Sequence, residues 1–176
     1  MIDTNLNHFE LFSLPVSFQV EDAVLDQEYK KLQAEVHPDR FIDADDRTRL
    51  QALQLTSMVN DAYETLKSPL KRSAYLLKLH DIDAEEHNQA HLQEEFLLQQ
   101  LEMREALETL IESEDVEGLE AMKNTVNKEK TGTLELFESR FLRKDFTAAK
   151  SNYNQLQFLF KLLDEIDKAE EKLLDY

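Results

Sequence analysis

The sequence predicts an all-α protein, and three observations lead to that prediction. Only two glycines and three prolines occur in 176 residues, so residues that interrupt helices are scarce. Leu, Glu, Gln and Lys, which favour helices, are abundant. Apolar residues recur at intervals of three and four in several segments, which is the period of an amphipathic helix. Cysteine is absent, which excludes a disulfide framework and thiolate metal ligands.

The first half of the chain begins with a short helical segment and one long helix. Residues 9–14 form a short apolar segment. The long helix is predicted from about Glu21 to His37, because Pro38 disfavours helical geometry in the residue before it. A polar loop over residues 39–46 follows. The apolar stripe of this long helix consists of Leu25, Tyr29, Leu32 and Val36.

A second long helix is predicted over residues 47–67. A shorter helix begins at Ser68-Pro69, an N-cap residue followed by a first-turn proline. Two antiparallel long helices would bury their stripes against each other and form a helical hairpin bundle with the polar loop at its tip. The stripe of the second long helix consists of Ala52, Leu55, Val59, Ala62 and Leu66.

The second half is predicted to be a three-helix bundle, with helices over about residues 88–112, 115–142 and 146–175. Its composition differs from that of the first half. Residues 1–80 contain nine Lys and Arg against thirteen Asp and Glu, whereas residues 81–176 contain eleven against twenty-four. The change near Asp81 predicts two domains, residues 1–80 and residues 81–176.

The net charge of −17 limits the classes of partner. An acidic chain is repelled by phosphate backbones and anionic membranes, so we expect neither a nucleic-acid nor a membrane partner. The N-terminus has no basic flank before an apolar run, and no apolar run reaches the roughly eighteen residues of a membrane span. A soluble, cytoplasmic protein is expected.

The residues around the polar loop resemble those of a J domain. His37-Pro38-Asp39 follows Tyr29-Lys30-Lys31-Leu32, and the segments 60–66 and 69–75 match downstream. A lone histidine at this place would be interpreted as a helix-end residue, but the downstream matches favour the J-domain interpretation. The resemblance implies that the tripeptide, with Tyr29, Lys30, Lys31 and Arg40, contacts the ATPase domain of a DnaK-type chaperone and triggers ATP hydrolysis there.

Nearly the whole chain resembles the HscB-type co-chaperones of iron–sulfur cluster assembly. The supporting phrases are residues 37–41, 73–77, 101–105 and 170–176. The resemblance implies a non-enzymatic co-chaperone without a cofactor. It would stimulate the ATPase of an HscA-type chaperone and deliver the IscU-type scaffold protein to it.

The helix over residues 88–112 carries two apolar faces. Leu97, Leu98 and Leu101 lie opposite a stripe that begins at Leu92. On the last helix, Phe158 and Leu162 lie off the main stripe, which runs from Ala149 to Leu174. Either both faces are buried within the chain, or the second face is a docking patch. The other members of the first stripe are Phe96, Met103, Leu107 and Leu110.

The family resemblance implies that the second face binds the scaffold protein. The contact residues would be Leu97, Leu98, Leu101 and Phe158, with Glu102, Arg104 and Glu105 at the rim.

Two features of the sequence, acidic residues on the first long helix and a histidine pair, bear on other interpretations. Asp26, Glu28 and Glu35 dilute the basic face that J domains carry before the loop, which favours a specialised chaperone. His87 and His91 have the spacing of a helical metal pair, but no third ligand is evident, so no metal site is expected. The alternatives are a J protein with another client, a helical metallohydrolase using this histidine pair, and a purely structural helical protein.

Overall fold

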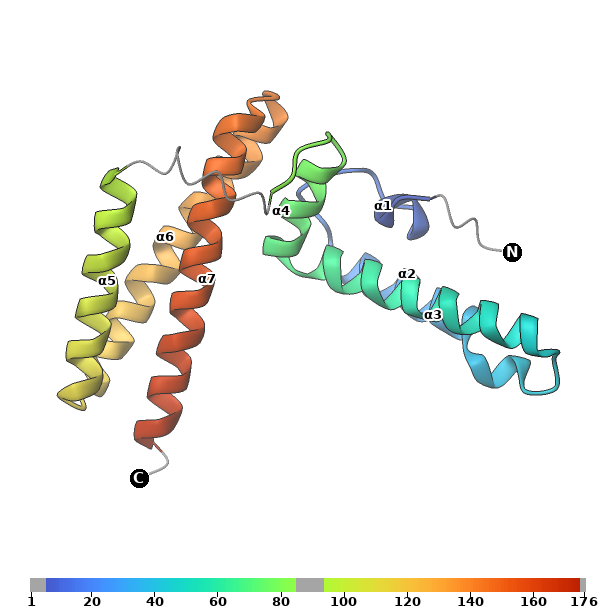
Figure 1. Ribbon diagram of the computed structural model, residues 1–176, viewed down its shortest axis with the longest axis horizontal. Helices are drawn as coiled ribbons and strands as arrows, with labels where there is room; N and C mark the ends of the chain where they lie inside the picture. Colours follow the sequence, from blue (N-terminus) through green and yellow to red (C-terminus); the bar gives the residue numbers. More distant parts are fainter. Residues whose placement is uncertain (1–5, 85–93, 175–176) are drawn as a thin grey trace. The chain divides into compact units, whose positions relative to one another are not determined.

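A computed structural model describes residues 6–84 and 94–174 of the chain (Figure 1). Every regular element in these two segments is a helix, as the composition predicted. The chain divides into two compact units, Met1–His80 and Asp81–Tyr176, which we call unit 1 and unit 2.

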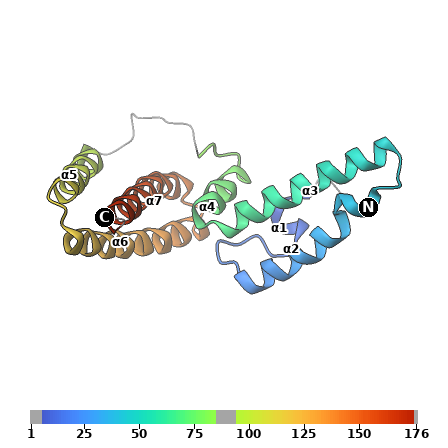
Figure 2. The same ribbon diagram turned by 90° about the horizontal axis from the view of Figure 1, so that it is seen from below.

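Unit 1 is a helical hairpin with two short helices packed on it. Its elements are α1 (His8–Leu11), α2 (Asp22–Val36), a 3₁₀ turn η1 (Pro38–Phe41), α3 (Asp46–Lys67) and α4 (Pro69–Lys78). The two long helices run side by side, and η1 lies at the end where the chain passes from one to the other (Figure 2). The predicted helices are confirmed. The predicted loop over residues 39–46 is partly wrong, because η1 occupies its first residues.

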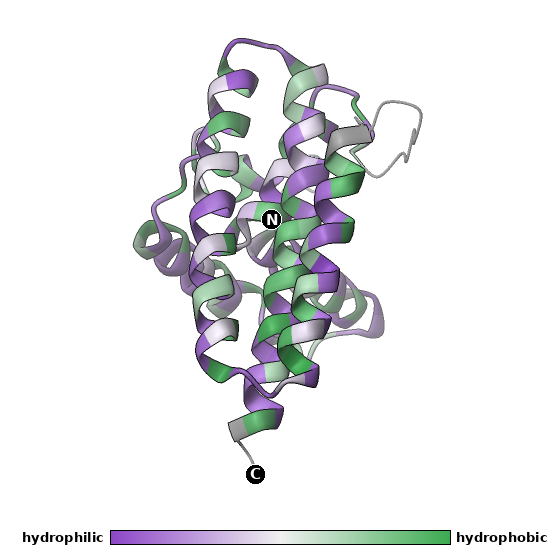
Figure 3. Ribbon diagram, turned by 90° about the vertical axis from the view of Figure 1, so that its left-hand side faces the viewer, coloured by the Kyte–Doolittle hydropathy of each residue, from purple (hydrophilic) through white to green (hydrophobic). Residues whose placement is uncertain are grey.

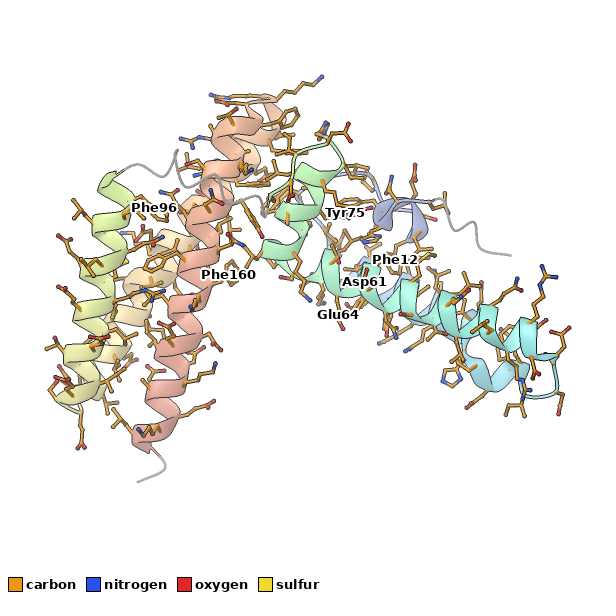
Figure 4. The ribbon with its side chains drawn as sticks, in the orientation of Figure 1. Phe12, Asp61, Glu64, Tyr75, Phe96 and Phe160 are labelled. Carbon is orange, nitrogen blue, oxygen red and sulfur yellow. The ribbon has the colours of Figure 1, made fainter. Side chains whose placement is uncertain are left out.

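The core of unit 1 consists of the predicted stripes together with α1. Leu25, Val59 and Leu66 are fully buried between the long helices, and Phe9 and Phe12 are buried beside them. Tyr75 of α4 reaches α1, where its hydroxyl accepts the N–H of His8 at 3.0 Å and its ring stacks on His8 (Figure 4). The helix starts follow their capping residues, since the side chains of Asp45 and Ser68 accept backbone N–H groups of α3 and α4.

Unit 2 is a bundle of α5 (Glu94–Glu112), α6 (Val116–Leu142) and α7 (Phe146–Leu174). Both turns between these helices have the same construction. Glu114 and Lys144 adopt the left-handed conformation with φ of 54° and 60°, and the next residue donates its N–H to a carbonyl five residues back. That next residue, Asp115 or Asp145, also accepts an N–H of the following helix. The predicted breaks near residues 113–114 and 144–145 are thus confirmed.

A buried apolar cluster holds the three helices of unit 2 together. Figure 3 shows that hydrophobic and hydrophilic residues are interspersed along each helix, as the amphipathic pattern requires. Lys123 of α6 adds an ion pair at the surface, because its Nζ lies 2.6 Å from carboxylate oxygens of both Asp167 and Glu170 of α7. These two carboxylates raise the pKa of Lys123. The buried members of the cluster are Leu107, Leu119, Val126, Phe158, Leu159, Leu162, Leu163, Ile166 and Ala169.

Candidate functional site

The His37-Pro38-Asp39 tripeptide turns the chain out of α2 and into η1. His37 has an extended backbone with φ −56° and ψ 129°, the conformation that a following proline favours. Its Nδ1 atom accepts the N–H of Asp39 at 3.3 Å and lies 3.5 Å from the Oδ2 atom of Asp39. Both side chains are exposed to solvent. The side chains of His37 and Asp39 thus lie beside each other and are open to solvent.

The backbone on both sides of the tripeptide is fixed by hydrogen bonds to the end of α2. The guanidinium of Arg40 donates to the carbonyl of Ala34 at 3.2 Å, and its backbone N–H donates to the carbonyl of His37 at 3.0 Å. The Thr56 hydroxyl of α3 donates to the carbonyl of Val36 at 3.0 Å. Two of the last four carbonyls of α2, those of Ala34 and Val36, are therefore bonded by the loop and by α3. This gives the tripeptide a defined direction.

The other predicted chaperone-binding residues occupy three different environments. Tyr29 is half-buried. Its hydroxyl donates to Asn60 at 3.0 Å, and its ring stacks on Tyr63 with centroids 4.0 Å apart. Lys31 is exposed and pairs with Glu28 at 2.6 Å. Lys30 is exposed. Tyr29 therefore joins α2 to α3, and the two lysines present the positive charge.

A polar network next to Tyr29 holds α2 and α3 together. The Asp26 carboxylate accepts the Lys67 ammonium at 2.8 Å and the Tyr63 hydroxyl at 2.9 Å. The hydrogen bond from Lys67 and then that from Tyr63 lower the pKa of Asp26. The same carboxylate raises the pKa of Tyr63 and of Lys67. The acidic residue that dilutes the basic face of α2 is thus part of the contact between the long helices.

The two apolar faces predicted for the helix over residues 88–112 are present on α5. Phe96, Met103 and Leu107 pack on the buried cluster of unit 2, and Figure 4 shows Phe96 on the side of α5 toward α7. Leu97, Leu98 and Leu101 are 47%, 55% and 55% exposed, and we call them the leucine face. The predicted rim residues Glu102, Arg104 and Glu105 are exposed as well. Leu92 lies outside the described residues.

Phe158 is not on the outward face where the sequence placed it. Its side chain is only 7% exposed and belongs to the buried cluster, as does Leu162. Its ring meets that of Phe96 edge-on with centroids 6.2 Å apart, and the Arg104 guanidinium carbon lies 5.9 Å from the ring centre. The physical reason is that α7 contacts both α5 and α6, so its buried arc is wider than one stripe. The sequence signal for this burial was that apolar residues occur around most of the circumference of α7, which is typical of a helix buried on more than one side.

The histidine pair considered for metal binding, His87 and His91, lies outside the described residues. Within residues 6–84 and 94–174, no group of three His, Cys, Asp or Glu side chains is arranged to hold a metal ion. No helix in the same segments is long and apolar enough to cross a membrane.

Sequence comparisons with known proteins cover both units of the chain. A family model described as the HSCB C-terminal oligomerisation domain matches residues 92–167. The co-chaperone protein HscB homolog of Vibrio cholerae is 36% identical over 170 residues, which are 96% of this chain and 99% of that protein. The chain belongs to the HscB family of co-chaperones.

Solved structures of the HscB family agree with this assignment. The chaperone HscB from Vibrio cholerae superimposes with a TM-score of 0.87 at 34% identity, covering 96% of this chain and 99% of that one. The human co-chaperone protein HscB also gives 0.87, at 30% identity, with 94% and 83% covered. Family membership confirms the sequence-based expectation of an all-α, J-type co-chaperone of iron–sulfur cluster assembly.

Proposed function

We propose that this protein acts at two ends during iron–sulfur cluster assembly. Unit 1 is a J domain that stimulates the ATPase of an HscA-type chaperone. Unit 2 binds the IscU-type scaffold protein and delivers it to that chaperone. Family membership supports the general role, and the exposed residues of each unit support the specific one.

The ATPase-stimulating end is supported by the way the tripeptide is presented. The Asp39 carboxylate is exposed and suits an arginine on the partner, because such pairs form strong charge-assisted hydrogen bonds. Lys30 and Lys31 add positive charge on α2. The acidic residues Glu28 and Glu35 on the same helix reduce that charge, which favours a specialised chaperone over a general one.

The observation that carries the proposal for unit 2 is the leucine face. Its three side chains are about half exposed on a helix whose other side is already buried in the core of unit 2. An exposed apolar cluster with a charged rim is typical of a protein-binding surface. Leu97, Leu98 and Leu101 would enter the contact, and Glu102, Arg104 and Glu105 would surround it. Phe158 supports α5 from beneath, and its ring holds Arg104 at the rim.

Because both surfaces belong to one chain, client delivery and ATPase stimulation can be coupled. When the scaffold protein is bound to unit 2, it is tethered to the chaperone that unit 1 contacts. Tethering raises the effective concentration of the client and couples its delivery to ATP hydrolysis.

The test measures the ATPase rate of the HscA-type chaperone with this protein and with the scaffold protein, added separately and together. More-than-additive stimulation supports the proposal, and simple additivity contradicts it. Calorimetric titration with the scaffold protein tests the client alone. Absence of binding at concentrations of about ten micromolar and above would point to a J protein with another client.

A further inference from the structure

A cavity of about 320 Å³ lies beside the tripeptide in unit 1. Its volume is at the lower end of the roughly 300–1,000 Å³ that is typical of ligand-binding clefts. Apolar side chains supply most of its wall: Val36 from the end of α2, Phe41 from η1, and Ala52 and Leu55 from α3. The remaining lining residues are Glu35, Thr48 and Gln51.

The wall of the cavity is continuous with the tripeptide. Val36 immediately precedes His37, and Phe41 immediately follows Arg40. Ile42, the next residue, is an exposed apolar side chain. The cavity and the exposed Ile42 of this chain therefore lie within a few residues of the place where a partner would contact His37 and Asp39.

The helical side of the cavity is preformed. Val36 and Ala52 are buried. The single hydroxyl hydrogen of Thr56 is shared between the carbonyl of Val36 at 3.0 Å, which joins α3 to α2, and the carbonyl of Ala52 on its own helix at 2.8 Å. The opposite side is Phe41, a half-buried residue on a single 3₁₀ turn. Ordering costs little when one wall of a binding site is already fixed.

We propose that this cavity seats an apolar side chain of the chaperone ATPase that the tripeptide contacts. The inference rests on the proposed function of unit 1 and adds a second contact to it. An apolar wall excludes charged and strongly polar groups, because burying them without hydrogen-bond partners is costly. The position of the cavity beside His37 and Asp39 favours the chaperone as the occupant over a second copy of this chain, and the sedimentation experiment below distinguishes the two.

The test fills the cavity from its edge. Gln51 is exposed and lines the cavity, so Gln51→Trp can place its ring over the apolar wall without disturbing the core. Gln54→Trp is the matched control, because Gln54 is also exposed on α3 and is not among the lining residues. Thr48→Leu provides a second filling substitution. Thermal unfolding establishes that each full-length variant is folded.

The readout is the concentration of co-chaperone that half-maximally stimulates the ATPase of the HscA-type chaperone. Gln51→Trp and Thr48→Leu are expected to raise it by about tenfold, while Gln54→Trp leaves it unchanged. The maximal rate is retained in all three, since His37 and Asp39 are intact. In the wild-type protein, methyl NMR signals of Val36 and Leu55 are expected to shift when the chaperone is added.

Different failures have different meanings. If the wild-type protein stimulates and both filling variants match Gln54→Trp, the cavity proposal is wrong and the proposed function stands. If the filling variants change self-association in sedimentation experiments but not stimulation, the occupant is a second copy and the proposal is overturned. If the wild-type protein does not stimulate at all, the proposed function falls and takes this inference with it.

Discussion

The two candidate binding surfaces are constructed in opposite ways. The tripeptide is a short polar segment whose direction is set by hydrogen bonds from Arg40 and Thr56 to the end of α2. The leucine face is part of a regular helix, and its position follows from burial of the opposite side of α5. A polar contact of defined geometry is lost when one group is changed. An apolar face loses affinity in proportion to the area removed.

The interiors of the two units differ in the same sense. The long helices of unit 1 are joined by an apolar stripe and also by the stacked tyrosines Tyr29 and Tyr63 beside the Asp26–Lys67 ion pair. The core of unit 2 is an apolar cluster, with Lys123 pairing at its surface. The stability of unit 1 should therefore depend on the ionisation of Asp26, whereas the apolar cluster of unit 2 should respond to changes in side-chain volume.

The largest effect is expected from His37→Gln, which should abolish ATPase stimulation. Glutamine lacks the imidazole that accepts the Asp39 N–H, so both the side chain and the local geometry of the tripeptide change. Binding of the scaffold protein to unit 2 should be unaffected. The ATPase rate and a calorimetric titration measure the two properties. Asp43→Asn, an exposed change in the same loop, should keep most of the stimulation. Full stimulation by His37→Gln would exclude the His37 imidazole as a required contact.

Phe158→Ala tests the structural role of the buried Phe158 ring in unit 2. Removing a buried phenylalanine is expected to cost about 3–5 kcal/mol of unfolding free energy, because it leaves a cavity beneath α5. Denaturant unfolding measures this cost. If Phe158 were mainly a contact residue, the variant would lose scaffold affinity while the stability of unit 2 stayed unchanged. That result would contradict the structural role assigned to this ring.

Leu97→Ala combined with Leu101→Ala should weaken scaffold binding by about tenfold or more without unfolding unit 2. The two side chains are exposed, and surface substitutions usually change stability by less than about 0.5 kcal/mol. Leu136→Ala is the matched control, since Leu136 is 50% exposed on α6 and lies outside the leucine face. Calorimetry would oppose the docking assignment if the double variant and the control bound equally well.

The sequence predicted the buried residues correctly where a helix packs against its neighbours through a single apolar stripe. The stripes of α2 and α3 follow the 3.6-residue period, and Pro38 and Ser68-Pro69 mark helix ends by local chemistry. Periodicity placed Phe158 on the wrong face, because it does not tell how many helices surround α7. Periodicity also could not predict the hydrogen bonds of Arg40 and Thr56 or the cavity beside Val36. They depend on how the loop folds back on α2, which no local pattern encodes.

Asp26→Asn should lower the stability of unit 1 at neutral pH. It should also make that stability change less when the pH is lowered. The pKa of Asp26 is lowered in the folded protein, so its ionised form stabilises the fold. That contribution is present above the ordinary carboxyl pKa of about 4 and is lost as the pH falls below it toward the folded value. Thermal unfolding at neutral and acidic pH measures it.

Glu28→Gln is the control for this prediction, because Glu28 pairs with Lys31 of its own helix and so does not join α2 to α3 through that pair. The stability difference between Asp26→Asn and the wild-type protein should shrink in acid. A difference that stays constant across this pH range would mean that the ion pair with Lys67 does not stabilise the hairpin.

The smallest effect is a gain expected in unit 2, from Gly132→Ala. Gly132 lies inside α6, and an added Cβ would meet no atom within 4 Å. Glycine inside a helix costs about 0.5–1 kcal/mol relative to alanine, mainly through backbone entropy. Unit 2 should be stabilised by about that amount, and scaffold affinity should not change, because the leucine face is untouched.

Gly118→Ala is the matched comparison for this gain. A Cβ at Gly118 would lie 2.5 Å from atoms of both Leu110 and Asp115, at the turn between α5 and α6. The same substitution should therefore destabilise the bundle there by displacing the Asp115 carboxylate that accepts the Gly118 N–H. Equal effects at the two glycines in denaturant unfolding would mean that helix propensity alone decides both. Opposite signs would show that the close approach to Leu110 and Asp115 at this turn outweighs the gain in helix propensity.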